Sequence, residues 1–313
     1  MRARCCASVN NNGKLPLATL LELLDFEWPS KARHLNGFVF INSILMSNNN
    51  YIIQGGEEGK KRLGVLSEIL EASTRSLIHS QIELEGKRFL DLGSGGGHVS
   101  LLASELVGPH GHVTAIDFDN EITHLARLDA EAKNISNINY RTLDAYELDY
   151  DQDFDVAYAR FLLSHLQHPE KVLHKMVQSV DTDGAVIVED IDFSGHFCYP
   201  PSEAFSAYVN YYTTVSLNNG QHPHLGLKLQ SMFKNQPQLK DVQFDVIQPC
   251  FNAGNGKWMA YHTLDKIKGT ILRQGLATED SIERVLLDLK QFTESEKSVI
   301  SLPRIFRATG IKA

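Results

Sequence analysis

The sequence predicts an α/β fold in which a mostly parallel, seven-stranded sheet has helices on both faces and a helical lid. Three observations lead to this fold class. A buried strand, a glycine-rich turn and a helix follow one another at residues 89–103. Four further apolar strand segments then alternate with helical segments, as they do in βαβ units. Two last strand segments, at 242–250 and 302–310, are expected to form an antiparallel edge.

The glycine-rich turn is the most informative stretch of the chain. Residues 89–98 read FLDLGSGGGH, with glycines at 93, 95 and 97 and Asp91 two positions before the first. Such glycines turn the chain, let a ligand approach bare backbone, and allow the helix to pack closely on the strand. The first amide N–H groups of the following helix then face the ligand. The D-x-G-x-G-x-G spacing favours S-adenosylmethionine over a dinucleotide or a flavin.

Polar residues follow the next strands, at the edge where open α/β sheets bind their ligands. These strand segments are expected at 111–118, 138–143, 154–159 and 184–190. Asp117 ends the first of them and suits ribose hydroxyl groups, and Phe118 can pack on an adenine ring. Asp144 and Ala145 end the next, where a carboxylate can accept the adenine amino group. The strand at 154–159 continues into Arg160.

With these motifs in this order, residues 84–193 resemble the core of a class I S-adenosylmethionine-dependent methyltransferase. The most similar group is the small-molecule type that includes ubiquinone and menaquinone methyltransferases. The matching motifs are DLGSGGG, the acid at 117, Asp144-Ala145, FDVAYARF and GAVIVED. The resemblance implies a Rossmann-like sheet and S-adenosylmethionine as cofactor, with methionine at the glycine loop, ribose at the second strand and adenine at the third. The cofactor-binding residues expected are Asp91, Gly93, Ser94, Gly95, Gly97, Asp117, Phe118, Asp144, Ala145 and Arg160.

The amino-acid composition limits the kinds of partner that the protein is expected to bind. The net charge of −8 and the pI near 5.9 give no electrostatic footprint for nucleic acid. The four cysteines form no disulfide or zinc pattern, and no run approaches the ~18 apolar residues of a membrane helix. We therefore expect a cytoplasmic enzyme, monomeric or homodimeric, with a small-molecule acceptor and neither a nucleic acid nor a membrane as partner.

Four regions follow along the chain. Residues 1–50 have no counterpart in the resembling family and are expected to be an extension without ordered structure, with Met46 as the functional start. A docking or oligomerisation arm is the alternative, and it stays open. Residues 51–83 should place a helix, at 57–80, over the cofactor; 84–193 should bind it; and 194–313 should form the lid and the last two strands. The resemblance implies as further cofactor neighbours Tyr51, Gln54, Glu58 and Arg62.

Methyl transfer from a sulfonium is an in-line displacement, so a base is needed only if the acceptor must lose a proton. His165 follows the fourth strand and His196 the fifth, and both are candidates for that base. A structural role for His165, capping or packing against the next helix, is the alternative. The fifth strand also ends in three acids, Glu189, Asp190 and Asp192. We expect no metal there, because alternation puts Glu189 on the opposite face of the strand.

The predicted function is methyl transfer to oxygen, nitrogen or carbon of a partly apolar small molecule. A nicotinamide-dependent reductase would use a similar first βαβ unit, but the glycine spacing and Asp91 disfavour it. A non-catalytic S-adenosylmethionine-binding subunit is a second alternative, because the glycine loop indicates binding and not turnover. A protein methyltransferase is a third, and would need an open acceptor cleft.

Overall fold

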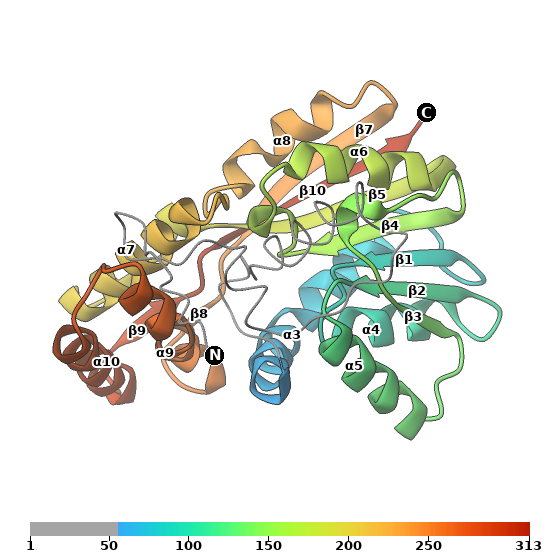
Figure 1. Ribbon diagram of the computed structural model, residues 1–313. Helices are drawn as coiled ribbons and strands as arrows, with labels where there is room; N and C mark the ends of the chain where they lie inside the picture. Colours follow the sequence, from blue (N-terminus) through green and yellow to red (C-terminus); the bar gives the residue numbers. More distant parts are fainter. Residues whose placement is uncertain (1–55) are drawn as a thin grey trace, which may run out of the picture. The chain divides into compact units, whose positions relative to one another are not determined.

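The computed structural model describes residues 56–313, and the expectations for residues 1–55 lie outside this part. One sheet has the strand order β3-β2-β1-β4-β5-β10-β7 (Figure 1). Its strands are β1 Arg88–Leu92, β2 His112–Asp117, β3 Ile138–Thr142, β4 Phe154–Arg160, β5 Val180–Asp192, β7 Leu239–Ile247 and β10 Arg304–Lys312. The first five are parallel, and β10 runs antiparallel to both of its neighbours, β5 and β7. The predicted Rossmann-like α/β fold is confirmed.

Helices cover both faces of the sheet because β1, β4 and β5 are buried on both sides. One face packs against α3 Gly56–His79, α4 His98–Val107 and α5 Asn120–Ala132. The other face packs against α6 Pro169–Ser179 and α8 Gly226–Lys234. Within residues 56–313 no helix combines the length and apolar character needed to span a bilayer.

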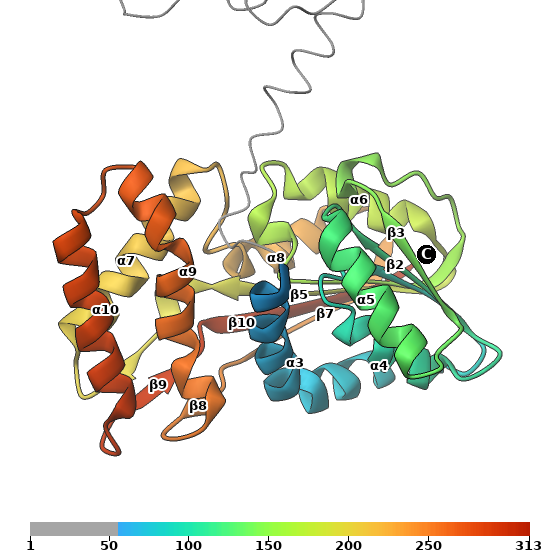
Figure 2. The same cartoon turned by 60° about the horizontal axis from the view of Figure 1, so that its bottom comes forward.

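A second layer of packing lies beyond the sheet. It consists of α7 Glu203–Asn218, α9 Met259–Arg273 and α10 Glu279–Glu294, whose apolar faces share one core. A small sheet of β6 Cys198–Tyr199, β9 Val299–Ser301 and β8 Cys250–Phe251 completes it. Figure 2 shows these elements, called the cap below, beyond the end of β5 and the start of β10.

Residues 194–313 were expected to form the lid and the last two strands, but the first two helices of this region lie in different layers. Its first helix, α7, belongs to the cap. Its second helix, α8, packs on the sheet instead, because Leu229 and Phe233 are fully buried in the core that contains Phe306 and Ala308 of β10. The expectation that α8 forms part of the lid is therefore wrong.

Candidate active site

The glycine loop between β1 and α4 has a backbone that only glycine adopts easily. Gly93, Gly95 and Gly97 have φ angles of 74°, 50° and 75°, in the left-handed region. A Cβ atom on Gly97 would lie 2.8 Å from the Tyr140 hydroxyl oxygen and 3.0 Å from Cβ of Ala126. The loop therefore packs closely against β3 and α5, and it presents bare backbone at the N-terminus of α4. This cradle fits the methionine end of S-adenosylmethionine.

Two carboxylates hold the glycine loop in place. The Gly95 N–H donates to Oδ2 of Asp117 at 2.8 Å, and the Asp119 N–H donates to Oδ1 of the same carboxylate at 3.0 Å. Asp91 is only 2% exposed and accepts a hydrogen bond from Ser100 Oγ at 2.6 Å. Burial raises the pKa of Asp91 to about 6, and it also raises the pKa of Asp117. Asp91 thus ties β1 to α4, whereas Asp117 contacts the loop backbone directly.

The predicted adenine-binding residues lie at neighbouring strand ends. The Leu143 N–H donates to the Asp117 carbonyl at 2.9 Å, which brings the end of β3 next to the end of β2. Phe118 is 49% exposed beside Asp117. Asp144 caps the short helix η1 Ala145–Glu147, with Oδ1 accepting the Tyr146 N–H at 2.9 Å, and Ala145 is buried.

Arg160 faces α3 from the end of β4. Its guanidinium donates to Thr74 Oγ1 at 3.3 Å and to Ser67 Oγ at 3.4 Å. The same Thr74 donates to the buried Glu189 at 2.8 Å, and Tyr158 donates to that carboxylate at 2.6 Å. Arg160 therefore belongs to a polar network that fixes α3 on the sheet, close enough to Asp91 to lower its pKa in opposition to burial.

An aromatic pocket lies where the core, α3 and the cap meet. Phe161 follows β4, Phe193 follows β5, and Tyr208 and Tyr212 come from α7. The pocket adjoins the glycine loop, because a Cβ on Gly93 would lie 3.0 Å from Leu162, the neighbour of Phe161. The full lining is Arg62, Leu66, Phe161, His165, Ile191, Phe193, His196, Tyr208, Tyr212, Met259, Thr263, Leu302, Pro303 and Ile305. The two predicted catalytic histidines thus line one pocket.

His196 has a defined tautomer. Its Nε2 lies 2.7 Å from the Ser301 carbonyl oxygen, and because a carbonyl can only accept, this nitrogen carries the proton. Nδ1 is buried and has no hydrogen-bond partner in the described part of the chain. The rings of Phe193, Phe205 and Tyr208 meet the imidazole edge to face. Loss of water around the ring lowers the pKa of His196 to about 4, so it is a neutral acceptor at pH 7.

His165 lies in the turn η2 Leu163–His165 after β4. Desolvation, helped by the charge of Arg62, lowers its pKa to about 4, against a hydrogen bond with Gln221 that raises it. The turn is held by the buried Asp190, whose Oδ2 accepts the Ser164 N–H at 3.0 Å. Burial raises the pKa of Asp190 to about 6. His165 is therefore neutral at pH 7 as well.

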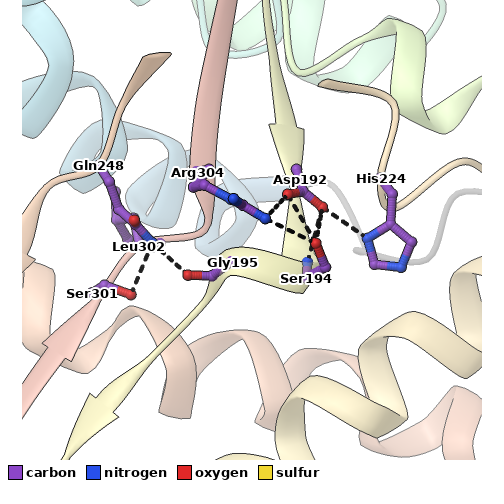
Figure 3. A network of polar contacts seen from close by, with 8 residues as sticks. All are labelled: Asp192, Ser194, Gly195, His224, Gln248, Ser301, Leu302 and Arg304. Carbon is purple, nitrogen blue, oxygen red and sulfur yellow. Dashed lines mark hydrogen bonds and ion pairs between the residues drawn. The ribbon is translucent and has the colours of Figure 1, made fainter. Parts of the chain in front are cut away.

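A polar network supports the wall of the pocket that contains His196 (Figure 3). Asp192 at the end of β5 is fully buried and pairs with Arg304 of β10 at 2.6 Å and with His224 at 3.0 Å. Gln248, just after β7, donates to the Gly195 carbonyl at 2.7 Å and the Leu302 carbonyl at 3.1 Å. The two hydrogen bonds from Gln248 fix Gly195, which precedes His196, and Leu302, which follows Ser301.

The three acids at the end of β5 have different partners. Glu189 contacts Thr74 and Tyr158, Asp190 contacts Ser164, and Asp192 contacts Arg304 and Ser194. Over residues 56–313 no group of three or more His, Cys, Asp or Glu side chains is arranged to hold a metal ion.

Several pocket residues could not be found from the sequence. Phe161, Met259, Thr263 and Pro303 come from elements far apart in the chain, and no motif marks them. Arg62 was expected as a cofactor neighbour, and the structure places it in the lining of the aromatic pocket. Besides the two histidines and Arg62, the sequence signal for this pocket is the run of aromatic residues at 205–212.

An α/β sheet with a glycine loop, strand-end acids and a capped pocket is typical of enzymes that bind a ligand containing a nucleoside. Residues 83–236 match the model of a family described as a methyltransferase domain. This match to a methyltransferase domain agrees with the resemblance that the motifs in this part of the chain predict.

Individual relatives share this part of the chain. The ubiquinone/menaquinone biosynthesis C-methyltransferase UbiE of Vibrio parahaemolyticus is 32% identical over 125 residues, covering 39% of this chain and 48% of the relative. A ubiquinone biosynthesis O-methyltransferase of Coxiella burnetii is 33% identical over 117 residues, covering 37% and 48%. The chain thus spans about half the length of these curated relatives. The crystal structure of the YcgJ protein from Bacillus subtilis has the same fold, with a TM-score of 0.51, 20% identity, and coverage of 77% of this chain and 98% of that one.

Proposed function

We propose that the protein transfers a methyl group from S-adenosylmethionine to oxygen, nitrogen or carbon of a small, partly apolar acceptor. The observation that carries this proposal is the aromatic pocket, which adjoins the glycine loop and contains both His165 and His196. Two relatives of the domain are named as C- and O-methyltransferases of quinone biosynthesis, which supports a small-molecule acceptor. In this proposal residues 84–193 bind the cofactor, α3 covers it, and the cap completes the acceptor pocket.

Bound S-adenosylmethionine would supply an activated methyl group on a sulfonium. The chain's own residues then act mainly by positioning. The bare backbone of the loop at Gly93, Ser94, Gly95 and Gly97 would lie against the methionine end, and Asp117 would accept hydrogen bonds from the ribose hydroxyls. Asp144 and Phe118 would contact the adenine. Asp91 and Arg160 would act indirectly. Asp91 would hold α4 on β1, and Arg160 would hold α3 on the end of β4.

His196 is the better candidate for a base. Its Nδ1 is a buried acceptor on the pocket wall, and its tautomer is fixed by the Ser301 carbonyl. That nitrogen is suited to receive a proton from an acceptor O–H or N–H group as the methyl group is transferred. His165 lines the same pocket and would contact the acceptor there.

The alternatives have less support. A nicotinamide-dependent reductase does not fit the methyltransferase family match. A non-catalytic binding subunit would have no use for two desolvated histidines in a pocket beside the loop. The cytoplasmic location, the monomeric or homodimeric state and the lack of nucleic-acid and membrane partners stay predictions.

The first test is calorimetric binding of S-adenosylmethionine and S-adenosylhomocysteine to wild type and Asp117→Ala. We expect micromolar binding to wild type and at least a roughly tenfold weaker affinity in the variant, because hydrogen bonds to a charged acceptor contribute about 1.5–3 kcal/mol. Asp183→Ala is the matched control, since this exposed acid lies near the start of β5 and pairs only with Lys240 among the described residues. Folded wild type that binds neither ligand would refute the proposal.

A further inference from the structure

Arg62 points into the aromatic pocket and not toward the glycine loop. Leu66, one helical turn further along α3, lines the same pocket. Leu63, the next residue around the helix, packs against the loop instead, with its Cδ1 3.2 Å from where a Cβ on Gly95 would lie. The geometry of α3 therefore separates two contacts: Leu63 covers the cofactor loop, and Arg62 faces the space where the acceptor would bind.

Arg62 gives the described lining of this pocket its positive charge. Among the described residues that line it there is no Asp, Glu or Lys, and both histidines are neutral at pH 7 because desolvation lowers their pKa values to about 4. Its charge reaches the other lining groups, since it contributes to the lowered pKa of His165 and also acts to lower that of Tyr208. The pocket thus has a positive potential over apolar walls.

Within residues 62–313 the guanidinium has no ion-pair partner, and its Nε is buried with no hydrogen-bond partner. A desolvated cation costs free energy unless an anion or acceptor compensates it. The neighbouring polar groups of the pocket do not do so. His196 Nδ1 could accept a hydrogen bond, but Nδ1 of His196 and Nε of Arg62 both lack a partner in the described part of the chain. Neither His196 nor Thr263 carries a negative charge that would balance the guanidinium. Among the described residues nothing balances this charge, and an anionic ligand group would do so.

We infer that the acceptor carries a carboxylate on an apolar, ring-sized body, and that Arg62 binds this carboxylate. The inference rests on the proposed function and specifies its substrate class. A carboxylate matches the fork of the guanidinium and balances its single charge. An amine would be repelled, because no lining acid among the described residues offsets Arg62. Phe161, Phe193 and Tyr212 would surround the apolar body.

The test uses a matched pair of probes, phenylacetate and phenylacetamide, which have the same shape and differ in charge. Their affinities are measured by ligand-observed NMR titration of the full chain in the presence of saturating S-adenosylhomocysteine. We expect Arg62→Met to weaken phenylacetate binding at least about tenfold and phenylacetamide binding less than about twofold. Arg75→Met is the control on the same helix, because Arg75 pairs with Glu71 and Glu105 outside the pocket. Its affinity for phenylacetate should equal that of wild type.

The affinity of S-adenosylhomocysteine for Arg62→Met separates the outcomes. An unchanged value, with selective loss of phenylacetate, supports the inference. A large loss of S-adenosylhomocysteine affinity would overturn it, because Arg62 would then bind the cofactor. Equal binding of the two probes to wild type, or binding of neither, would also overturn it while leaving the proposed function intact. If wild type does not bind S-adenosylhomocysteine at all, the proposed function fails, and this inference fails with it.

Discussion

His196 is held neutral by surroundings that stabilise only its uncharged form. Aromatic rings exclude water from the imidazole, and the Ser301 carbonyl accepts the proton on Nε2. No acid lies among the described residues of the pocket lining to stabilise an imidazolium. The ring is thus a weak base that stays unprotonated near pH 7. Its low pKa also means that acid favours the unfolded chain, in which the ring can take up a proton.

This sensitivity can be measured with His196→Phe. The unfolded chain protonates the histidine near pH 6.5, whereas the folded protein does so only near pH 4. The contribution of neutral His196 to the free energy of unfolding is therefore complete above pH 6.5, and it is lost as the pH falls toward 4. Between pH 7 and pH 5, wild type should lose about 2 kcal/mol more of its free energy of unfolding than the variant does. Urea unfolding at both pH values checks this.

The matched control for that experiment is His110→Phe, because His110 is exposed after α4. Its free energy of unfolding should follow that of wild type at both pH values. Identical pH dependence of wild type and His196→Phe would contradict the desolvated environment described for the ring.

At the scale of elements, the junction between sheet and cap depends on one buried ion pair. The chain passes between the two layers after β5, before α8, after β7 and before β10, and the network in Figure 3 takes residues from each of these connections. Asp192 is fully buried, so removing Arg304 would leave its carboxylate without its strongest partner.

We therefore expect Arg304→Met to lower the free energy of unfolding by about 2 kcal/mol, less than for a fully buried pair because Arg304 is partly exposed. Equilibrium urea unfolding measures the change. Lys240→Met breaks an exposed ion pair with Asp183 and should leave the unfolding midpoint unchanged. A similar result for both variants would show that the junction network does not stabilise the fold.

The long elements could be predicted from the sequence, because each has its own periodicity. The strands of the main sheet and the helices α3 and α4 lie close to the predicted ranges. The strands β6, β8 and β9 have two or three residues each, which is too short for any alternation to be seen. The placement of α8 failed for a different reason. An apolar helix face predicts burial but does not specify which layer will bury it.

At the scale of the whole molecule, the two parts of the site differ in how predictable they are. The proposed cofactor side is built from one contiguous loop and from the ends of successive strands, so the positions of Asp117 and Asp144 at strand ends could be predicted from order and spacing alone. The proposed acceptor side joins Arg62 of α3, Phe161 after β4 and Met259 of α9. Their proximity depends on how the cap packs, and sequence spacing contains no information about that.

Titration of the whole molecule reflects a balance between its buried acids and histidines. Asp91 and Asp190 have pKa values near 6 in the folded protein against an ordinary 3.8, because burial disfavours their charged forms. Such a group stabilises the fold at low pH and loses this effect as the pH rises through 6. When the pH falls from 7 to 5, each of the two acids should raise the free energy of unfolding by about 1.3 kcal/mol, while His165 and His196 should each lower it by about 2 kcal/mol.

These opposing contributions cancel only in part, so we expect the free energy of unfolding of wild type to fall by roughly 1 kcal/mol between pH 7 and pH 5. Asp155 and Glu105, whose pKa values are lowered by their arginine partners, titrate below this window and do not disturb the balance. Asp190→Asn removes one of the compensating acids, so its free energy of unfolding should fall by about 1 kcal/mol more than that of wild type over the same range. Urea unfolding at pH 7, 6 and 5 and constant ionic strength measures the difference. Parallel curves for the two proteins would mean that Asp190 is ionised throughout, and the buried carboxyl would then need a compensating charge that its contacts with Ser164 and Ile191 do not supply.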